Sequence, residues 1–141
     1  REMPYFEQEL LERAQEKGPL TDRVYLDALD RSRLLSRTEG IDAALQQFKI
    51  DALVAPTAGP SWMIDWVNGD RDSGGCSTPA AMAGYPHITV PAGLIFGLPV
   101  GISFFGAAWS EPALLKIAYA FEQATKARKA PRLLSTVRFE V

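Results

Sequence analysis

Cys76 and His87 are the single cysteine and the single histidine of the chain, and they are the first residues to consider for chemistry. A thiol becomes a nucleophile when an adjacent base takes its proton, and imidazole is such a base. Nothing in the sequence is placed to orient the His87 ring, so a structural role for both residues is favoured. The same counts exclude a disulfide within the chain and any metal site that needs two imidazoles.

Three aspartates, Asp65, Asp70 and Asp72, lie close together in a polar stretch. Paired carboxylates can exchange protons or bind a divalent cation. Their spacing lacks the regular alternation, and the Gly followed by Glu, of a calcium loop, so a solvated loop is favoured over a metal site. The following Ser73-Gly74-Gly75-Cys76 could hold an anion, but it is not followed by the Lys of a nucleotide-binding loop.

Ser103 lies in Gly101-Ile102-Ser103-Phe104-Phe105, which has the first half of the G-x-S-x-G pattern of serine hydrolases. The pattern fails at Phe105, and the segment falls inside a predicted strand. Ser103 is therefore predicted to be a structural residue. The residues by themselves contain no complete catalytic set, and we expect no catalytic residue, metal or cofactor in this chain.

The composition is that of a globular protein. The chain has 141 residues, 47% of them hydrophobic, which is enough for one domain over residues 1–141. Fifteen basic and seventeen acidic residues give a net charge of −2, which argues against a nucleic-acid or membrane surface. The first residues are too polar for a secretory signal, and the longest apolar stretch, 92–109, is broken by Gly and Pro. These features favour a cytoplasmic over an exported location.

Helices are predicted at both ends of the chain. Pro4 to Lys17 has Pro in its first turn and is followed by Gly-Pro, which stops a helix. Thr21 is the expected N-cap of a second helix, whose apolar stripe runs to Phe48 and allows a kink at Gly40. Ser110 is the expected N-cap of the last helix, with Pro in its first turn.

Three short apolar runs, at 51–55, 87–91 and 98–106, predict strands, and a predicted turn at 96–99 makes the last two a hairpin. A long loop, 57–77, and a short helix, 78–83, separate the first two strands. Helices that flank a small mixed sheet indicate an α/β or α+β fold. Three strands make a thin sheet, and a run as apolar as 53–55 needs neighbours on both edges. The sequence therefore predicts more sheet elsewhere.

Four blocks of sequence stand out together: LVAPT at 53–57, AAMAGYPHITVPAG at 80–93, GLPVGISFFG at 97–106 and AWSEPALL at 108–115. In this order they resemble the C-terminal portion of the amidase signature enzymes, and the resemblance covers about residues 25–131. The segment 62–70 is most similar to the peptide-amidase branch of that family. The resemblance implies an α/β, partial amidase-signature fold that lacks its N-terminal catalytic part.

The resemblance implies that this chain lacks the catalytic residues of the family. Its members hydrolyse carboxamides to carboxylate and ammonia with a Ser–cis-Ser–Lys triad and a Gly-rich oxyanion loop, which lie N-terminal to the region seen here. Gly74-Gly75-Cys76-Ser77 imitates that loop, but it follows the 53–57 block instead of preceding it. We therefore expect no amidase activity from the chain alone.

The resemblance also implies a role within an intact enzyme. The chain would supply strands, covering helices and a wall of the substrate pocket, with the N-terminal portion of the same enzyme as partner and a small amide or peptide amide as substrate. The residues expected to bind substrate are Trp62, Asp65, Trp66 and Asp70. The carboxylates would meet an ammonium or amide N–H, and the indoles a side chain. The alternative that this loop only packs on its own aromatic residues is equally favoured.

Two other functions stay open: an assembly module of the amidotransferase type, which works with partner chains, and a catalytically dead remnant. The chain is either a cut piece of an amidase or the product of a truncated reading frame that starts at Met3. In isolation it is expected to self-associate, because a sheet that ends early exposes edge groups that recruit another chain.

Overall fold

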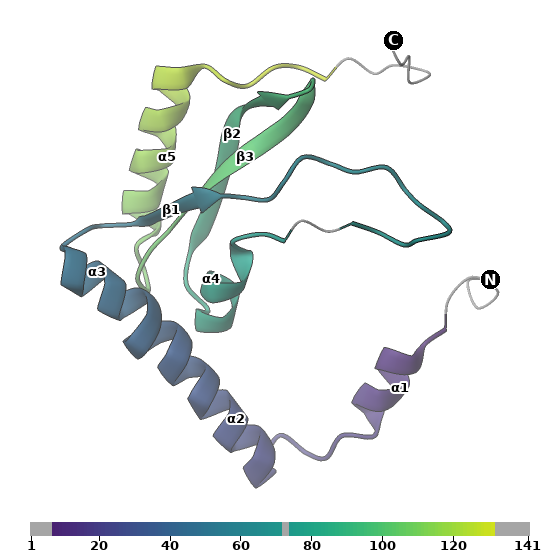
Figure 1. The fold of residues 1–141 in the computed structure, drawn as a ribbon. Coiled ribbons are helices and arrows are strands. Elements are labelled where there is room, and N and C mark those ends of the chain that lie inside the picture. Colours follow the sequence, from purple (N-terminus) through teal and green to yellow (C-terminus); the bar gives the residue numbers. More distant parts are fainter. Residues whose placement is uncertain (1–6, 72–73, 132–141) are drawn as a thin grey trace.

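The computed structural model describes residues 7–71 and 74–131 of the chain. Figure 1 shows a small sheet with helices on both of its faces, a long loop that leaves the sheet, and a first helix set apart from the rest. In chain order, the elements are α1 (Glu9–Gln15), α2 (Arg23–Arg33), the π-helix η1 (Leu34–Ile41), α3 (Asp42–Phe48), β1 (Leu53–Pro56), α4 (Ser77–Ala83), β2 (His87–Ile95), β3 (Leu98–Phe105) and α5 (Glu111–Thr125).

Within the described residues, the sheet has three strands in the order β1-β3-β2, so β3 is its centre. β1 pairs with β3 from Leu53 opposite Phe105 to Pro56 opposite Ile102. The three predicted strands and the flanking helices are confirmed, although β2 continues to Ile95 and not only over the predicted 87–91. The sheet is antiparallel throughout the described residues and not mixed. The reason is that β3 turns straight back from β2 and meets β1 running the opposite way.

The predicted hairpin between β2 and β3 is confirmed. Ile95 pairs with Leu98, which leaves Phe96 and Gly97 as a two-residue turn, so the predicted turn at 96–99 was too long by two residues. Both turn residues have positive φ, 51° and 79°, and this is the backbone that matches the twist of the two strands. Glycine adopts it without cost at the second position, and Phe96 takes it with its side chain fully exposed.

The two faces of the sheet carry separate hydrophobic clusters. Successive residues of a strand point to opposite faces, so Phe104 and Phe105 face different helices. The buried members of the cluster on the α5 face are Val90, Phe104, Leu114 and Ala118. Those of the cluster on the α4 and η1 face are Ile41, Ala80, Ala83 and Phe105. β3 thus contributes to both cores.

α2, η1 and α3 follow one another as a continuous helical rod (Figure 1). The sequence allows a kink at Gly40, and at this position the rod widens into the π-helix η1. A Cβ at Gly40 would lie 2.5 Å from the carbonyl oxygen of Leu35, so this turn has room only for glycine. The N-cap is Asp22, whose carbonyl accepts the Leu26 N–H, so the prediction of Thr21 was wrong by one residue.

The first helix is shorter than the predicted range 4–17. α1 begins at Glu9 and ends at Gln15, and the start of the predicted range lies outside the described residues. None of the residues of α1 is buried. Without a packed face, a helix of this length has little to stabilise it.

Polar contacts fasten the helical rod to α4. Arg37 Nε donates to the carbonyl of Ala83 over 2.7 Å, and its guanidinium lies 5.6 Å from the centre of the Tyr85 ring. The Tyr85 hydroxyl donates to Asp42 Oδ2 over 2.9 Å. Burial first, and then this bond to Asp42, raise the pKa of Tyr85 above its ordinary value of 10.0.

Ser103 is fully buried at the middle of β3, and the prediction that it is structural is confirmed. Its hydroxyl lies 2.8 Å from that of Thr57 and 2.9 Å from that of Thr89. A Cβ at the neighbouring Gly101 would approach both threonine side chains to 2.8 Å. Glycine at 101 therefore lets the two threonines close over the strand, and Ser103 on β3 links β2 to Thr57, the residue that follows β1.

Most large apolar side chains among the described residues are not buried. Eight hydrophobic residues are buried there, whereas 24 large hydrophobic residues are exposed. They include Phe48 at 65%, Val54 at 58% and Tyr119 at 65% exposed. Exposure of so many large apolar side chains is typical of a surface that packs against another protein part.

Removing the Ser103 hydroxyl should destabilise the chain. Ser103→Ala leaves two threonine hydroxyls without their shared partner, and we expect a loss of about 1–3 kcal/mol in the free energy of unfolding, measured with urea. Thr125→Val is the control, because it removes an exposed hydroxyl bonded only to the preceding helical turn. It should change the free energy by less than about 0.5 kcal/mol. Equal effects of the two substitutions would contradict the role given to Ser103.

Candidate functional site

The loop from Thr57 to Cys76 begins and ends at the same place beside β1. The Thr57 N–H donates to the carbonyl of Gly101 over 2.9 Å, and the Thr57 carbonyl accepts the Cys76 N–H over 3.1 Å. Ala58 and Gly75 form an isolated antiparallel bridge. The loop therefore leaves the sheet and returns to it through paired backbone, and its distal part forms the wide arc in Figure 1.

Asp65 organises the tip of this loop. Its Oδ1 accepts the N–H groups of Val67 and Asn68, each over 2.9 Å, and its Oδ2 accepts the Asn68 side-chain amide over 2.9 Å. Such bonds from an aspartate to backbone two and three residues ahead make a turn. The Asn68 side chain, followed by the backbone bonds, lowers the pKa of Asp65 below its ordinary value of 3.8.

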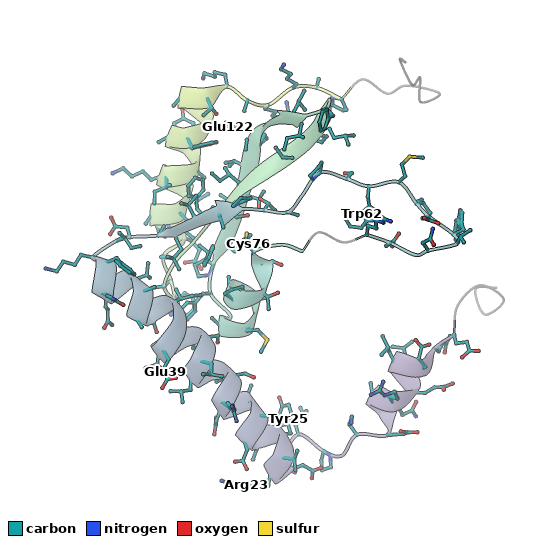
Figure 2. All side chains as sticks on the ribbon, in the orientation of Figure 1. Arg23, Tyr25, Glu39, Trp62, Cys76 and Glu122 are labelled. Atoms are coloured by element: carbon teal, nitrogen blue, oxygen red, sulfur yellow. The ribbon has the colours of Figure 1, made fainter. Side chains whose placement is uncertain are left out.

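The other proposed substrate-binding residues lie on the same loop. The Trp62 side chain is 44% exposed and points from the outgoing arm of the loop toward the returning arm (Figure 2). Trp66 is 89% exposed, and Asp70 is exposed as well. Asp72 and Ser73, considered above for cation or anion binding, lie outside the described residues.

An apolar groove of about 760 Å³ lies between the base of the loop and the β2–β3 hairpin. None of the four proposed substrate-binding residues lines it. Its wall combines both ends of the loop with all three strands, and the lining residues are Val54–Pro56, Ala58–Pro60, Gly74–Cys76, Ala92, Ile95 and Val100–Ile102. Among the described residues, Cys76 is the only ionisable residue of this lining, and the groove therefore suits an apolar group.

Cys76 and His87 are brought together, although sequence reasoning favoured separate structural roles. Cys76 Sγ lies 3.7 Å from His87 Nε2. The His87 ring is stacked on Phe105, with ring centres 5.8 Å apart and planes 25° apart. The orienting group that the sequence did not reveal is thus an aromatic ring of the neighbouring strand. Cys76 directly precedes α4, and His87 is the first residue of β2. The chain reverses direction after short α4, so that the start of β2 lies beside the start of the helix.

Metal-binding clusters and membrane-spanning helices are both absent from the described part of the chain. In 7–71 and 74–131, no three histidine, cysteine, aspartate or glutamate side chains are placed to share a metal ion. Over the same ranges, no helix has the length and apolar character needed to cross a membrane.

Comparison with known proteins places the fold. No protein-family model matches the chain. The solved structure of native peptide amidase from Stenotrophomonas maltophilia is 48% identical with a TM-score of 0.83, over 91% of this chain and 26% of that chain. A probable amidase from Arabidopsis thaliana is 41% identical over 109 residues, 77% of this chain and 18% of that protein. A glutamyl-tRNA(Gln) amidotransferase protein from Methanosarcina barkeri is 38% identical over 111 residues, 74% of this chain and 22% of that protein.

The chain spans about a fifth to a quarter of the length of these relatives. Its sheet and helices therefore correspond to part of a larger α/β fold. The chain belongs to the amidase signature family, and within it resembles peptide amidase.

The Asp65 turn can be tested by titration. Because the folded-state pKa of Asp65 is lowered, the ionised carboxylate stabilises the turn above pH 3.8, and this contribution is lost as the pH falls through the folded-state pKa. In an NMR titration of the side-chain carboxyl, we expect a midpoint below 3.8 that moves up in Asn68→Ala. A midpoint at 3.8 or higher in the unmodified chain would contradict this account of the loop.

Proposed function

We propose that this chain is the C-terminal part of an amide-bond hydrolase acting on peptide amides, and that it forms one structural unit over residues 1–141. It supplies strands, covering helices and a wall of the substrate pocket. The Ser–cis-Ser–Lys triad belongs to the N-terminal portion, so the chain is inactive alone. One observation carries the proposal: the match to peptide amidase spans 91% of this chain but 26% of that enzyme.

The surface of the chain supports a large missing neighbour. β1 lies at one edge of the sheet within the described residues, and Val54 on that strand is 58% exposed. Unpaired strand edges with apolar side chains recruit a further strand. A second apolar groove, of about 570 Å³, lies between the helical rod and α4, where Leu35 and Met82 are half exposed. In the proposed enzyme, the N-terminal portion covers both.

The four loop residues remain our proposed pocket wall. Asp65 already accepts three hydrogen bonds within the loop, so its main contribution is to hold the tip in shape. Trp66 is 89% exposed and has an indole face available for a substrate side chain. Asp70 supplies a carboxylate for an ammonium or amide N–H, and Trp62 supports the arm that carries them.

An assembly role of the amidotransferase type is the second candidate. It is favoured by the 38% identity to the Methanosarcina barkeri protein. The peptide amidase match has higher identity over more of the chain, and for this reason we place hydrolysis first. A dead remnant is the third reading, and the following experiment separates it from the first.

Complementation tests the proposal directly. We expect neither this chain nor the N-terminal portion of the Stenotrophomonas maltophilia peptide amidase to release ammonia from a peptide amide when assayed alone. Mixed, they should form a complex and gain at least about a thousandfold in rate, because the triad then has its pocket. A stable complex without activity would indicate a remnant, and no complex between two folded partners would contradict the proposal.

Two exposed tryptophans serve as matched variants in that assay. In the reconstituted pair, Trp66→Ala should raise KM for the peptide amide and leave complex formation unchanged. Trp109→Ala removes a side chain that is 88% exposed but lies outside the loop, two residues before the start of α5, and should leave KM unchanged. If both variants alter KM equally, the loop is not the pocket wall.

The isolated chain should self-associate, since it exposes a strand edge and apolar faces. At tens of micromolar, light scattering is expected to show a dimer or larger species. Val54→Lys places a charge on the exposed edge strand and should shift the chain toward monomer. A stable monomer that binds little hydrophobic dye would mean that the three strands close a core unaided.

A further inference from the structure

The cysteine and histidine beside the apolar groove have no role in the proposed hydrolysis. We propose that Cys76 and His87 form a reactive thiol–imidazole pair, and that the groove makes this thiol a site of covalent modification by uncharged, apolar electrophiles. The inference is independent of amide hydrolysis, since it rests on the geometry of this chain alone.

The first support is that separate elements hold the two groups in contact. The Cys76 N–H donates to the Thr57 carbonyl, which fixes the backbone under the thiol. The stack on Phe105 limits rotation of the His87 ring. With Sγ 3.7 Å from Nε2, the thiol is within the distance of a sulfur hydrogen bond. Both residues are partly buried, so this contact has less competition from water than a surface pair would have.

The second support is that the thiol faces a binding surface. Cys76 lines the groove of about 760 Å³, together with aliphatic residues of β1, β2 and β3. Figure 2 shows Cys76 close to the sheet, at the returning end of the loop. Since the described residues contribute no charged side chain to the lining, an apolar substituent can desolvate there without leaving a buried charge unpaired.

The reaction proposed is conjugate addition to an electron-poor alkene. With its ring proton on Nδ1, His87 accepts the Cys76 proton at Nε2. The thiolate pair forms a bond to one alkene carbon, and the π pair of the double bond moves onto the adjacent carbon. That carbon takes a proton from the imidazolium, directly or through water. A thioether results, the neutral imidazole is restored, and no oxidant or leaving group is needed.

The experiment uses the 141-residue chain, whose single cysteine makes the readout specific. The probe is N-phenylmaleimide at pH 7, with incorporation followed by mass spectrometry. An adjacent imidazole activates a thiol by accepting its proton, so removal of that base should slow the addition. We expect the unmodified chain to react about tenfold faster than His87→Gln or His87→Phe. The second variant keeps a ring to stack on Phe105, and Cys76→Ser should take up no label.

The groove is tested by comparing probes. N-phenylmaleimide and the charged N-(2-carboxyethyl)maleimide are reacted with the native chain and with the same chain unfolded in urea. The preference for the phenyl probe should be at least about threefold greater in the native chain. If the histidine variants fail to fold, the native and unfolded chains still decide, because the native thiol should react faster with the phenyl probe. The proposal would be overturned if the unmodified chain and the histidine variants reacted with N-phenylmaleimide at equal rates. It would also be overturned if the native thiol reacted no faster than the unfolded one, or if the preference for the phenyl probe were the same in the native and unfolded chains.

Discussion

The structure depends on β3 being paired along both edges. Its buried Ser103 joins Thr57, 46 residues earlier in the chain, to Thr89 on the other side of the sheet. This junction places the base of the long loop against the hairpin, and so creates the wall of the apolar groove. It also brings the returning end of the loop, with Cys76, beside the first residue of β2. Without the pairing of β1 to β3, neither the groove nor the Cys76–His87 contact would exist.

The same arrangement leaves much of the fold without cover. Each face of the sheet has a small cluster of four buried residues, centred on Phe104 or Phe105. The outer faces of the helical rod and of α5 expose large apolar side chains such as Phe48 and Tyr119. In the function we propose, the remaining three quarters of an amidase would pack against this surface. That proposal would account for the exposed apolar side chains.

Local sequence patterns predicted most helices and strands, because apolar periodicity, turn residues and helix caps act over a few neighbouring residues. The apolar runs, the turn signal at 96–99 and the Ser110 helix start were enough for the hairpin and the last helix. The π-helix was missed because its glycine requirement depends on contact between Gly40 and the Leu35 carbonyl five residues away. The direction of β1 was missed because strand pairing across 46 residues leaves no local mark.

The candidate sites were predicted less completely. Family resemblance pointed to the loop that carries Trp62 to Asp70, and the spacing of Asp65 and Asn68 was an available signal for its turn. Cys76 and His87 were singled out by type, but their contact depends on how α4 reverses the chain and on Phe105 stacking on the imidazole. Neither the chain reversal nor the ring stacking can be predicted from a local sequence pattern.

Hydrogen exchange at one backbone amide tests the central claim, that the sheet continues beyond β1, most directly. The Thr57 N–H points to β3, so by alternation along the strand the Val54 N–H points to the other edge. In dilute chain, NMR should show fast exchange at Val54, slowing at least about tenfold when the N-terminal amidase portion is bound, as a strand pairs with β1. Amides of β3 should change little, since both of its edges are already paired. Unchanged exchange at Val54 in a complex that has demonstrably formed would contradict the account.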